Sequence, residues 1–188
     1  MVQKRLWVGV IVGVAALGLC PPCAEAKRVQ HELAPRGQSK PAAAPLLFLA
    51  SCDKASYGKS DPILMRFKIR NTGASPIWVN ARFYVSSERV PHEHREVFLR
   101  VTSPNGKPLP CKYEYPSGVP KSDSFQRLQP GQEAASDTTR DLRAFFNLTE
   151  PGRYTVIAVY DNIFGPELGL DTFQGQLSSD PVTLTITE

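Results

Sequence analysis

The 188-residue sequence is poor in the side chains that most often carry out chemistry. It contains three histidines and four cysteines, and no Gly-x-Ser-x-Gly motif, which excludes the nucleophile elbow of α/β-hydrolases. Gly58-Lys59-Ser60 has the ending of a phosphate-binding P-loop, but Asp53 stands where that motif needs its first glycine. No complete catalytic set is visible, so the sequence favours a binding protein over an enzyme.

A long hydrophobic run is missing except near the N-terminus. Lys4-Arg5 precedes the apolar run Leu6–Leu19, and Ala24-Glu25-Ala26 supplies the small residues of a cleavage site, as in a secretory signal peptide. The run is shorter than the ~20 residues that span a bilayer. We predict cleavage after residue 26, with Lys27 as the first mature residue, export to the periplasm or the extracellular space, and no membrane span after cleavage. A retained anchor and a lipid on Cys20 are the alternatives.

An excess of one charge sign is also missing from most of the chain. The net charge of +4 arises before residue 46, because the 16 basic and 16 acidic residues from there onward cancel. This balance gives no basic face for nucleic acid, so we predict no nucleic-acid partner. Residues 27–45 have no apolar period and are predicted to be a disordered linker. Residues 46–188 are long enough for one domain with its own core.

Within residues 46–188, short runs of alternating apolar and polar residues are separated by turns. The strongest run follows the Pro151-Gly152 turn, and both of its faces are apolar, which predicts a central strand buried on both sides. No helix of normal length is visible, and one helical turn is predicted over 141–146. Other strands are predicted at 46–52, 63–70, 76–85, 97–101, 109–115, 125–128, 133–139 and 181–187. The pattern predicts an all-β, antiparallel β-sandwich of about 7–9 strands.

A resemblance to a known group of folds rests on turn residues. Tyr154 closely follows Pro151-Gly152, which resembles the tyrosine corner of immunoglobulin (Ig)-like sandwiches. The order Asn71-x-Gly73, Pro104-x-Gly106, Pro130-Gly131 and Pro151-Gly152-x-Tyr154 is similar to small exported bacterial Ig-like domains, and more loosely to bacterial proteinase-inhibitor sandwiches. The resemblance implies an Ig-like β-sandwich in which Gly152 and Tyr154 are structural residues.

Two cysteines, Cys52 and Cys111, remain once the leader is removed. An even number of cysteines in an exported chain predicts one disulfide bond between them. Closing so long a loop would stabilise the fold by roughly 4 kcal/mol in the chain-entropy model.

The best candidate for a metal site is His92-Glu93-His94-Arg95-Glu96. In an extended backbone, the side chains of His92, His94 and Glu96 project to the same side and could share one metal ion. The competing interpretation is a solvated, charged loop. Asp161, Glu167 and Asp171 could offer oxygen ligands to calcium, but their spacing fits no EF-hand, and we predict no cofactor.

Two classes of function remain open. The first is an exported, non-enzymatic module that recognises a protein partner through its inter-strand loops, with an inhibitor of a secreted protease as a sharper version. The second is a metal-binding protein or metal-dependent enzyme that uses His92, His94 and Glu96. In the first case the recognition loops are 86–96, 116–124 and 161–173, and the aromatic residues there are either anchors or core: Phe125, Phe164 and Phe173.

Overall fold

A computed structural model describes residues 45–137 and 139–188, so the predicted leader and nearly all of the predicted linker lie outside the described residues. In this part of the chain the secondary structure is nearly all β, which confirms the predicted all-β class. No helix there is long and apolar enough to cross a membrane. The strands are β1 Leu46–Cys52, β2 Ser56–Tyr57, β3 Leu64–Asn71, β4 Ile77–Asn80, β5 Val85–Ser86, β6 Val97–Thr102, β7 Pro108–Leu109, β8 Phe125–Leu128, β9 Glu133–Ala135, β10 Arg140–Asp141, β11 Gly152–Asn162, β12 Gly175–Ser178 and β13 Val182–Ile186.

Helical segments are few and short. One α-helical turn, α1 (Leu142–Phe145), is accompanied by the 3₁₀ turns η1 (His92–His94), η2 (Ser122–Ser124) and η3 (Pro166–Leu168). The helical turn predicted over 141–146 is therefore present as α1. Asp141 caps it, because its side chain accepts a hydrogen bond from the Arg143 N–H.

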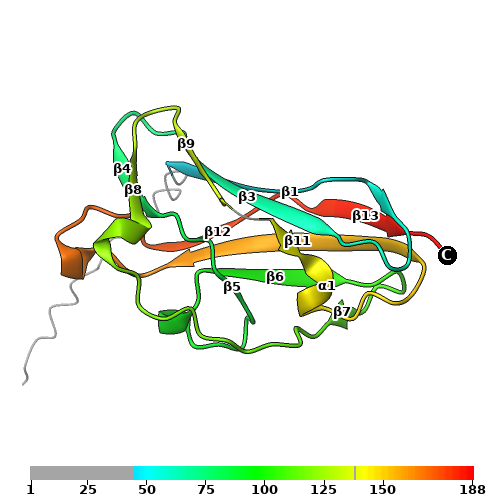
Figure 1. Ribbon diagram of the computed structural model, residues 1–188. Helices are drawn as coiled ribbons and strands as arrows, with labels where there is room; N and C mark the ends of the chain where they lie inside the picture. The colour runs from blue at the N-terminus through cyan, green and yellow to red at the C-terminus, as the bar shows by residue number, and fades with distance from the viewer. Residues whose placement is uncertain (1–44, 138) are drawn as a thin grey trace, which may run out of the picture. The chain divides into compact units, whose positions relative to one another are not determined.

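The strands form three sheets, and Figure 1 shows β1 and β3 lying above β11 and β6. The first sheet has the order β1-β3-β10, with β9 also paired to β3. The second has the order β2-β13-β11-β6-β5, with β12 paired to β11 and β7 paired to β6. β4 and β8 form the third. All pairs are antiparallel except β2 with β13 and β5 with β6.

The core lies between the first two sheets. In β3 the side chains of Met65, Phe67 and Ile69 are buried, whereas the basic side chains between them are exposed. This is the predicted period-two pattern of a strand with one face in the core. The opposite wall comes from the inward face of β11, whose fully buried side chains are Tyr154, Val156, Ala158 and Tyr160.

β11 lies in the interior of its sheet, as predicted, with β6 on one side and β12 and β13 on the other. Burial of both its faces is only partly correct. On the outward face Val159 is buried, but Thr155 and Ile157 are half-buried and line a groove. The reason is that no second sheet covers this face: part of it is covered by a loop, and part is open.

The prediction of one continuous strand over residues 76–85 is wrong. β4 pairs with β8 and β5 pairs with β6, so the chain leaves one sheet and enters another between them. At this crossover Phe83 has φ 51°, a left-handed conformation that bulky residues rarely adopt. Its ring is buried against Phe48, which offsets the backbone strain.

The predicted strand over residues 109–115 ends early. Only Leu109 continues the pairing with β6, opposite Val101. Pro110 follows directly and has no N–H to donate to a ladder, so the chain leaves the sheet there. The predicted Asn105-Gly106 turn does join β6 and β7, with Gly106 at φ 79°.

The hydroxyl groups of two tyrosines link β11 to other parts of the chain by hydrogen bonds. The Tyr154 hydroxyl donates a hydrogen bond to the carbonyl oxygen of Glu150 at 2.8 Å, and the Tyr160 hydroxyl bonds both backbone groups of Asn80 in β4. Gly152 has φ 132°, and a Cβ at this position would lie 2.8 Å from the Cβ of Pro104. Only glycine therefore fits where β11 begins.

The predicted disulfide between Cys52 and Cys111 is not formed in the structure, where both are free and do not lie at disulfide distance. Cys52 ends β1 in the first sheet, opposite Met65. Cys111 follows β7 at the second sheet, and its Sγ donates to the Tyr113 carbonyl at 3.3 Å. Each thiol packs against the core from its own sheet, and burial raises the pKa of Cys52.

Candidate functional site

Two loops are joined by a buried carboxylate beside the second sheet. We call residues 87–96 the His loop and residues 110–121 the Tyr loop. Glu96, at the end of the His loop, is fully buried and accepts hydrogen bonds from the Arg82 guanidinium and from the Tyr84 N–H at 3.1 Å. Arg82 also donates to the Gly118 carbonyl of the Tyr loop at 2.9 Å. One ion pair therefore holds both loops.

A second buried carboxylate holds the middle of the His loop. Asp161, near the end of β11, is fully buried. Its Oδ2 accepts hydrogen bonds from Arg95 Nε at 2.7 Å and Gln176 Nε2 at 3.1 Å, and lies 2.8 Å from His92 Nδ1. Removing either charge of such a pair would leave the other buried without compensation. Arg95 and Glu96 are thus structural residues, whereas Arg89 and Glu93 of the same loop are exposed.

The predicted metal set, His92, His94 and Glu96, is not brought together. η1 replaces the extended backbone on which that prediction rested, and in a 3₁₀ turn alternate residues do not share a side. His92 contacts Asp161 instead, and Glu96 contacts Arg82. Over residues 45–137 and 139–188 no group of three or more His, Cys, Asp or Glu side chains could hold a metal ion.

The acidic residues considered for calcium are not assembled either. Asp161 is engaged with Arg95, and the Glu167 carboxylate accepts the N–H of Gly165 in its own loop. Asp161 and Glu167 thus each have a local partner, whereas Asp171 contributes its backbone carbonyl to a hydrogen bond with the Trp78 N–H. The oxygen cluster that calcium needs does not form among these residues.

The His loop covers part of the outward face of β6 and β11. Phe98 lies between two guanidinium groups, with the Cζ of Arg95 at 4.9 Å and that of Arg100 at 5.2 Å from its ring centroid. Such cation–π contacts fix the ring and the arginines together. Arg100 also forms a half-exposed ion pair with Glu88, and this hydrogen bonding lowers the pKa of Glu88.

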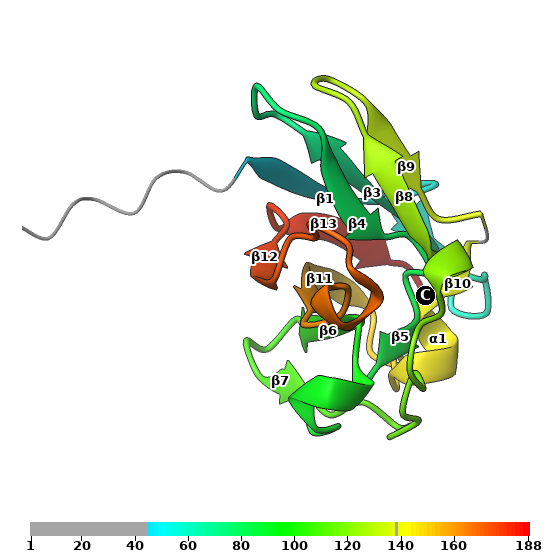
Figure 2. The ribbon, with the colours of Figure 1, turned by 90° about the vertical axis from the view of Figure 1, so that its left-hand side faces the viewer.

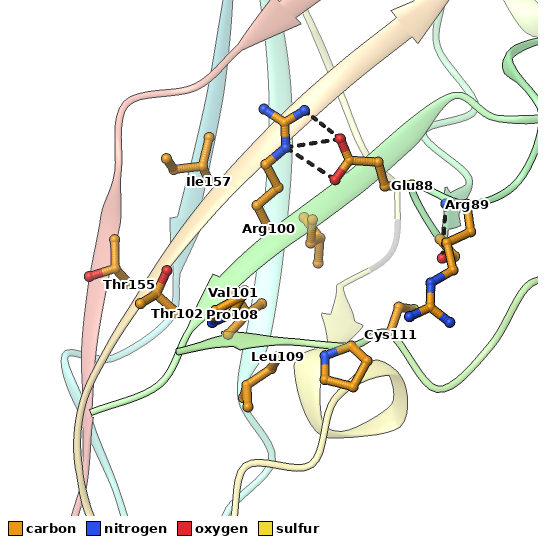
Figure 3. Close-up of a pocket in the computed structure, with 13 residues that line it drawn as sticks. Glu88, Arg89, Arg100, Val101, Thr102, Pro108, Leu109, Cys111, Thr155 and Ile157 are labelled. Carbon is orange, nitrogen blue, oxygen red and sulfur yellow. Dashed lines mark hydrogen bonds and ion pairs between the residues drawn. The ribbon is translucent and has the colours of Figure 1, made fainter. Parts of the chain in front are cut away.

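Beyond this pair the outward face is open and forms a groove of about 850 Å³ (Figure 3). Thr155 and Ile157 of β11 lie on one side, and Leu109 lies at the end away from the Glu88–Arg100 pair. Besides β11, the groove is lined by Ser87–Arg89 of the His loop, by Leu99–Thr102 of β6, and by Pro108–Cys111, which comprises β7 and the first two residues of the Tyr loop. It therefore offers a surface of mixed apolar and polar side chains with an ion pair at one end.

The Tyr loop presents aromatic rings next to this groove. Tyr113 and Tyr115 are 43% and 68% exposed, and their rings stack with centroids 5.4 Å apart. Glu114, between them, pairs with Arg89 of the groove at 3.5 Å. Val119, further along the loop, is 65% exposed. We call the groove together with Tyr113 and Tyr115 the candidate binding face.

The Tyr loop has no regular secondary structure before η2, yet its backbone is fixed at several points. The Lys112 N–H donates to the Phe145 carbonyl at 2.7 Å, and the Ser117 N–H donates to the His94 carbonyl at 2.7 Å. Arg82 holds the Gly118 carbonyl. These bonds lie on both sides of the tyrosine pair, so the exposed rings stand on a braced support.

Sequence reasoning missed this aromatic pair. Phe125, considered as an anchor, is buried, and Phe173 packs against Tyr160 in the core with ring centroids 6.3 Å apart. Phe164 is half-buried. Tyr113 and Tyr115 fall inside the predicted strand over 109–115, so they were not predicted to be exposed anchors. The available signal was the Tyr-x-Tyr pattern between Pro110 and Pro116, which is unfavourable for a strand inside a sheet.

Comparison with known proteins gives little further guidance. No protein-family model matches the chain, and no curated protein matches it. Among solved structures, the chain is similar to part of the β-glucosidase EmGH1 from Erythrobacter marinus, at 17% identity and a TM-score of 0.31. The similarity covers 76% of this chain and only 15% of that enzyme.

Proposed function

We propose that this protein is an exported, non-enzymatic module with an Ig-like β-sandwich domain, and that it holds a protein partner on its candidate binding face. The observation that most directly supports partner binding is the exposed, stacked pair Tyr113 and Tyr115 on a braced loop beside a groove. Two sheets around one core, together with the Tyr154 to Glu150 hydrogen bond, support the Ig-like assignment.

The energetics of aromatic side chains favour a protein partner at this face. A tyrosine buries about 150–250 Å² at low cost in side-chain entropy, and tyrosines are enriched among the residues that dominate binding energy. The bracing bonds around Ser117 and Gly118 fix the loop before a partner arrives. A fixed loop loses less entropy on binding, so more of the contact energy appears as affinity.

The buried charged groups support a non-enzymatic role. Among the described residues, Glu96 and Asp161 are the fully buried carboxylates, and each is engaged with an arginine. A general base must accept a proton from a substrate within hydrogen-bond reach, whereas both oxygens of Glu96 and the Oδ2 atom of Asp161 already accept hydrogen bonds from protein donors. These ion pairs hold the two loops in their observed conformation.

The test replaces tyrosine with a photo-activatable phenylalanine analogue at position 115 and maps the cross-linked partner in the native exported fraction. The same partner is then measured for binding to wild type, to Tyr113→Ser/Tyr115→Ser, and to the control Leu168→Ser. Leu168 is 41% exposed and lies on η3, so it matches Tyr113 in exposure but not in place.

We expect the double substitution to weaken binding at least tenfold, because two anchors are removed, and the control to bind as wild type does. A partner that binds the double variant as tightly as wild type would overturn the proposal. So would a partner lost equally from Leu168→Ser, because the tyrosines would then have no special role.

A further inference from the structure

β1 is an open edge of the first sheet. β1 pairs with β3 along one of its two sides, and β9 and β10 pair with the opposite side of β3. Figure 2 shows β1 at the margin of its sheet, with β3 as its neighbour. No strand of the described residues pairs with the outer side of β1.

The ladder to β3 shows which backbone groups face outward. The Asp53 N–H donates to the Leu64 carbonyl, and the Thr72 N–H donates to the Pro45 carbonyl, so odd-numbered residues direct their backbone groups toward β3. Antiparallel hydrogen bonding alternates along a strand, so the even-numbered residues direct theirs away from β3. These are Leu46, Phe48, Ala50 and Cys52. Such a row is a template for another strand.

The usual protections of an edge strand are missing from β1. Its seven residues, Leu-Leu-Phe-Leu-Ala-Ser-Cys, include no proline and no charge. The edge strands of the second sheet, β2, β5, β7 and β12, have only two to four residues each. β1 is therefore the long, uncharged, unprotected edge of this domain.

We propose that β1 pairs with β1 of a second copy of this chain, antiparallel about a two-fold axis at Leu49, so that two first sheets become one continuous sheet. In this register the outward backbone groups of residue 46 meet those of residue 52 in the partner, and those of residue 48 meet those of residue 50. The two-fold axis repeats both pairs. About eight main-chain hydrogen bonds form. An axis of this kind is the commonest symmetry of soluble homo-oligomers.

The order of side-chain sizes in β1 favours its own copy as the partner. Large residues lie in the first half and small ones in the second, so the two-fold places Phe48 opposite Ala50 and Leu46 opposite Cys52. Leu46 and Phe48 are buried, whereas Ala50 and Cys52 are only half-buried, which leaves space beside the small residues. On the outer face, the exposed Leu47 lies opposite Ser51.

Charge does not oppose this pairing. The nearest charged row, Arg66, Lys68 and Arg70, lies one strand away on β3. In the dimer the two rows are three strand spacings apart, roughly 14 Å, which exceeds the Debye length of about 8 Å at physiological salt. Lys68 and Arg70 also pair with Glu133.

A position-specific disulfide tests the register. Residue 49 faces its own copy across the two-fold, where Cα atoms of a non-hydrogen-bonded pair lie about 4.5 Å apart, within disulfide range. Leu49→Cys in the full mature chain should give covalent dimers on mild oxidation, in excess of the wild type. Leu47→Cys is the matched control, since residue 47 and its copy lie roughly 13 Å apart along the strands. Equal yields from the two variants would overturn the register.

Sedimentation equilibrium tests the association itself. A single strand pair buries less area than a stable dimer, so we expect wild-type self-association to increase with concentration over the micromolar to millimolar range. Leu49→Lys places two ammonium groups opposite each other, and Ala50→Pro removes an outward N–H without touching the ladder to β3. Both should remain monomeric and folded, while Leu168→Lys behaves as wild type. Wild type that stays monomeric throughout, or Leu49→Lys that still associates, overturns the proposal.

Discussion

At the scale of single residues, two substitutions of Tyr154 separate the contribution of its hydroxyl hydrogen bond from that of its buried ring. Its ring is buried, and its hydroxyl bonds the carbonyl of Glu150, a residue at an exposed position. Tyr154→Phe should cost only about 0.5–1.5 kcal/mol, since water can reach the freed carbonyl. Tyr154→Ala also opens a cavity and should cost about 3–5 kcal/mol. Urea midpoints at unchanged slope measure both, and equal costs would contradict this interpretation.

The Arg95–Asp161 pair is the residue-scale test of the His loop. Asp161 is fully buried and Arg95 nearly so, so Asp161→Ala or Arg95→Ala should each cost about 3–5 kcal/mol. The double substitution should cost less than the sum by about 1–3 kcal/mol. The control cycle uses Arg89 and Glu114, whose side chains are 70% and 56% exposed and should couple by less than about 1 kcal/mol. Similar coupling in both pairs would show that burial is not the cause.

At the scale of elements, the start of β11 depends on Gly152. Gly152→Ala should cost about 2–4 kcal/mol, because it adds both backbone strain at φ 132° and a clash with Pro104. Gly131→Ala is the control: its φ is 81°, but nothing lies within 4 Å of an added Cβ, so about 1 kcal/mol is expected. Denaturant unfolding compares them. A Gly152→Ala variant as stable as Gly131→Ala would show that Pro104 moves aside.

The placement of Cys52 and Cys111 on different sheets leads to a second prediction at this scale. The mature protein, unfolded without reductant, should show two titratable thiols per chain, because the elements that carry the cysteines do not bring them to disulfide distance. The same count after reduction is the control. A chain with no titratable thiol before reduction and two afterwards would restore the disulfide that the sequence predicts.

At the scale of the whole molecule, the proposal of export requires removal of the leader. N-terminal sequencing of the exported protein should begin at Lys27, and Ala26→Glu should accumulate the uncleaved precursor, because signal peptidase needs a small residue there. Substitution of Leu47 in the mature part is a suitable control. Export of the intact 188-residue chain, or a lipid found on Cys20, would contradict this prediction in favour of the two alternatives.

The sequence by itself determined the features that depend on neighbouring residues. The alternation in β3, the strand β6, the apolar run of β11 and the turn at Gly106 appear in the structure where they were predicted. The physical reason is that side-chain period and turn conformation are properties of a few consecutive residues. Such a pattern shows which face of a strand is apolar, but it contains no information on what covers that face.

The tertiary structure alone decided the candidate site. Arg95 and His92 both contact Asp161, 66 and 69 positions away, whereas Glu96 contacts Arg82, so His92 and Glu96 do not form a metal set. The groove beside Ile157 exists because the His loop covers only part of the outward face of β11. Tyr113 and Tyr115 are exposed because Pro110 takes the chain out of its sheet before it reaches them. These outcomes depend on which distant segments the fold brings together, and a local sequence pattern does not specify that.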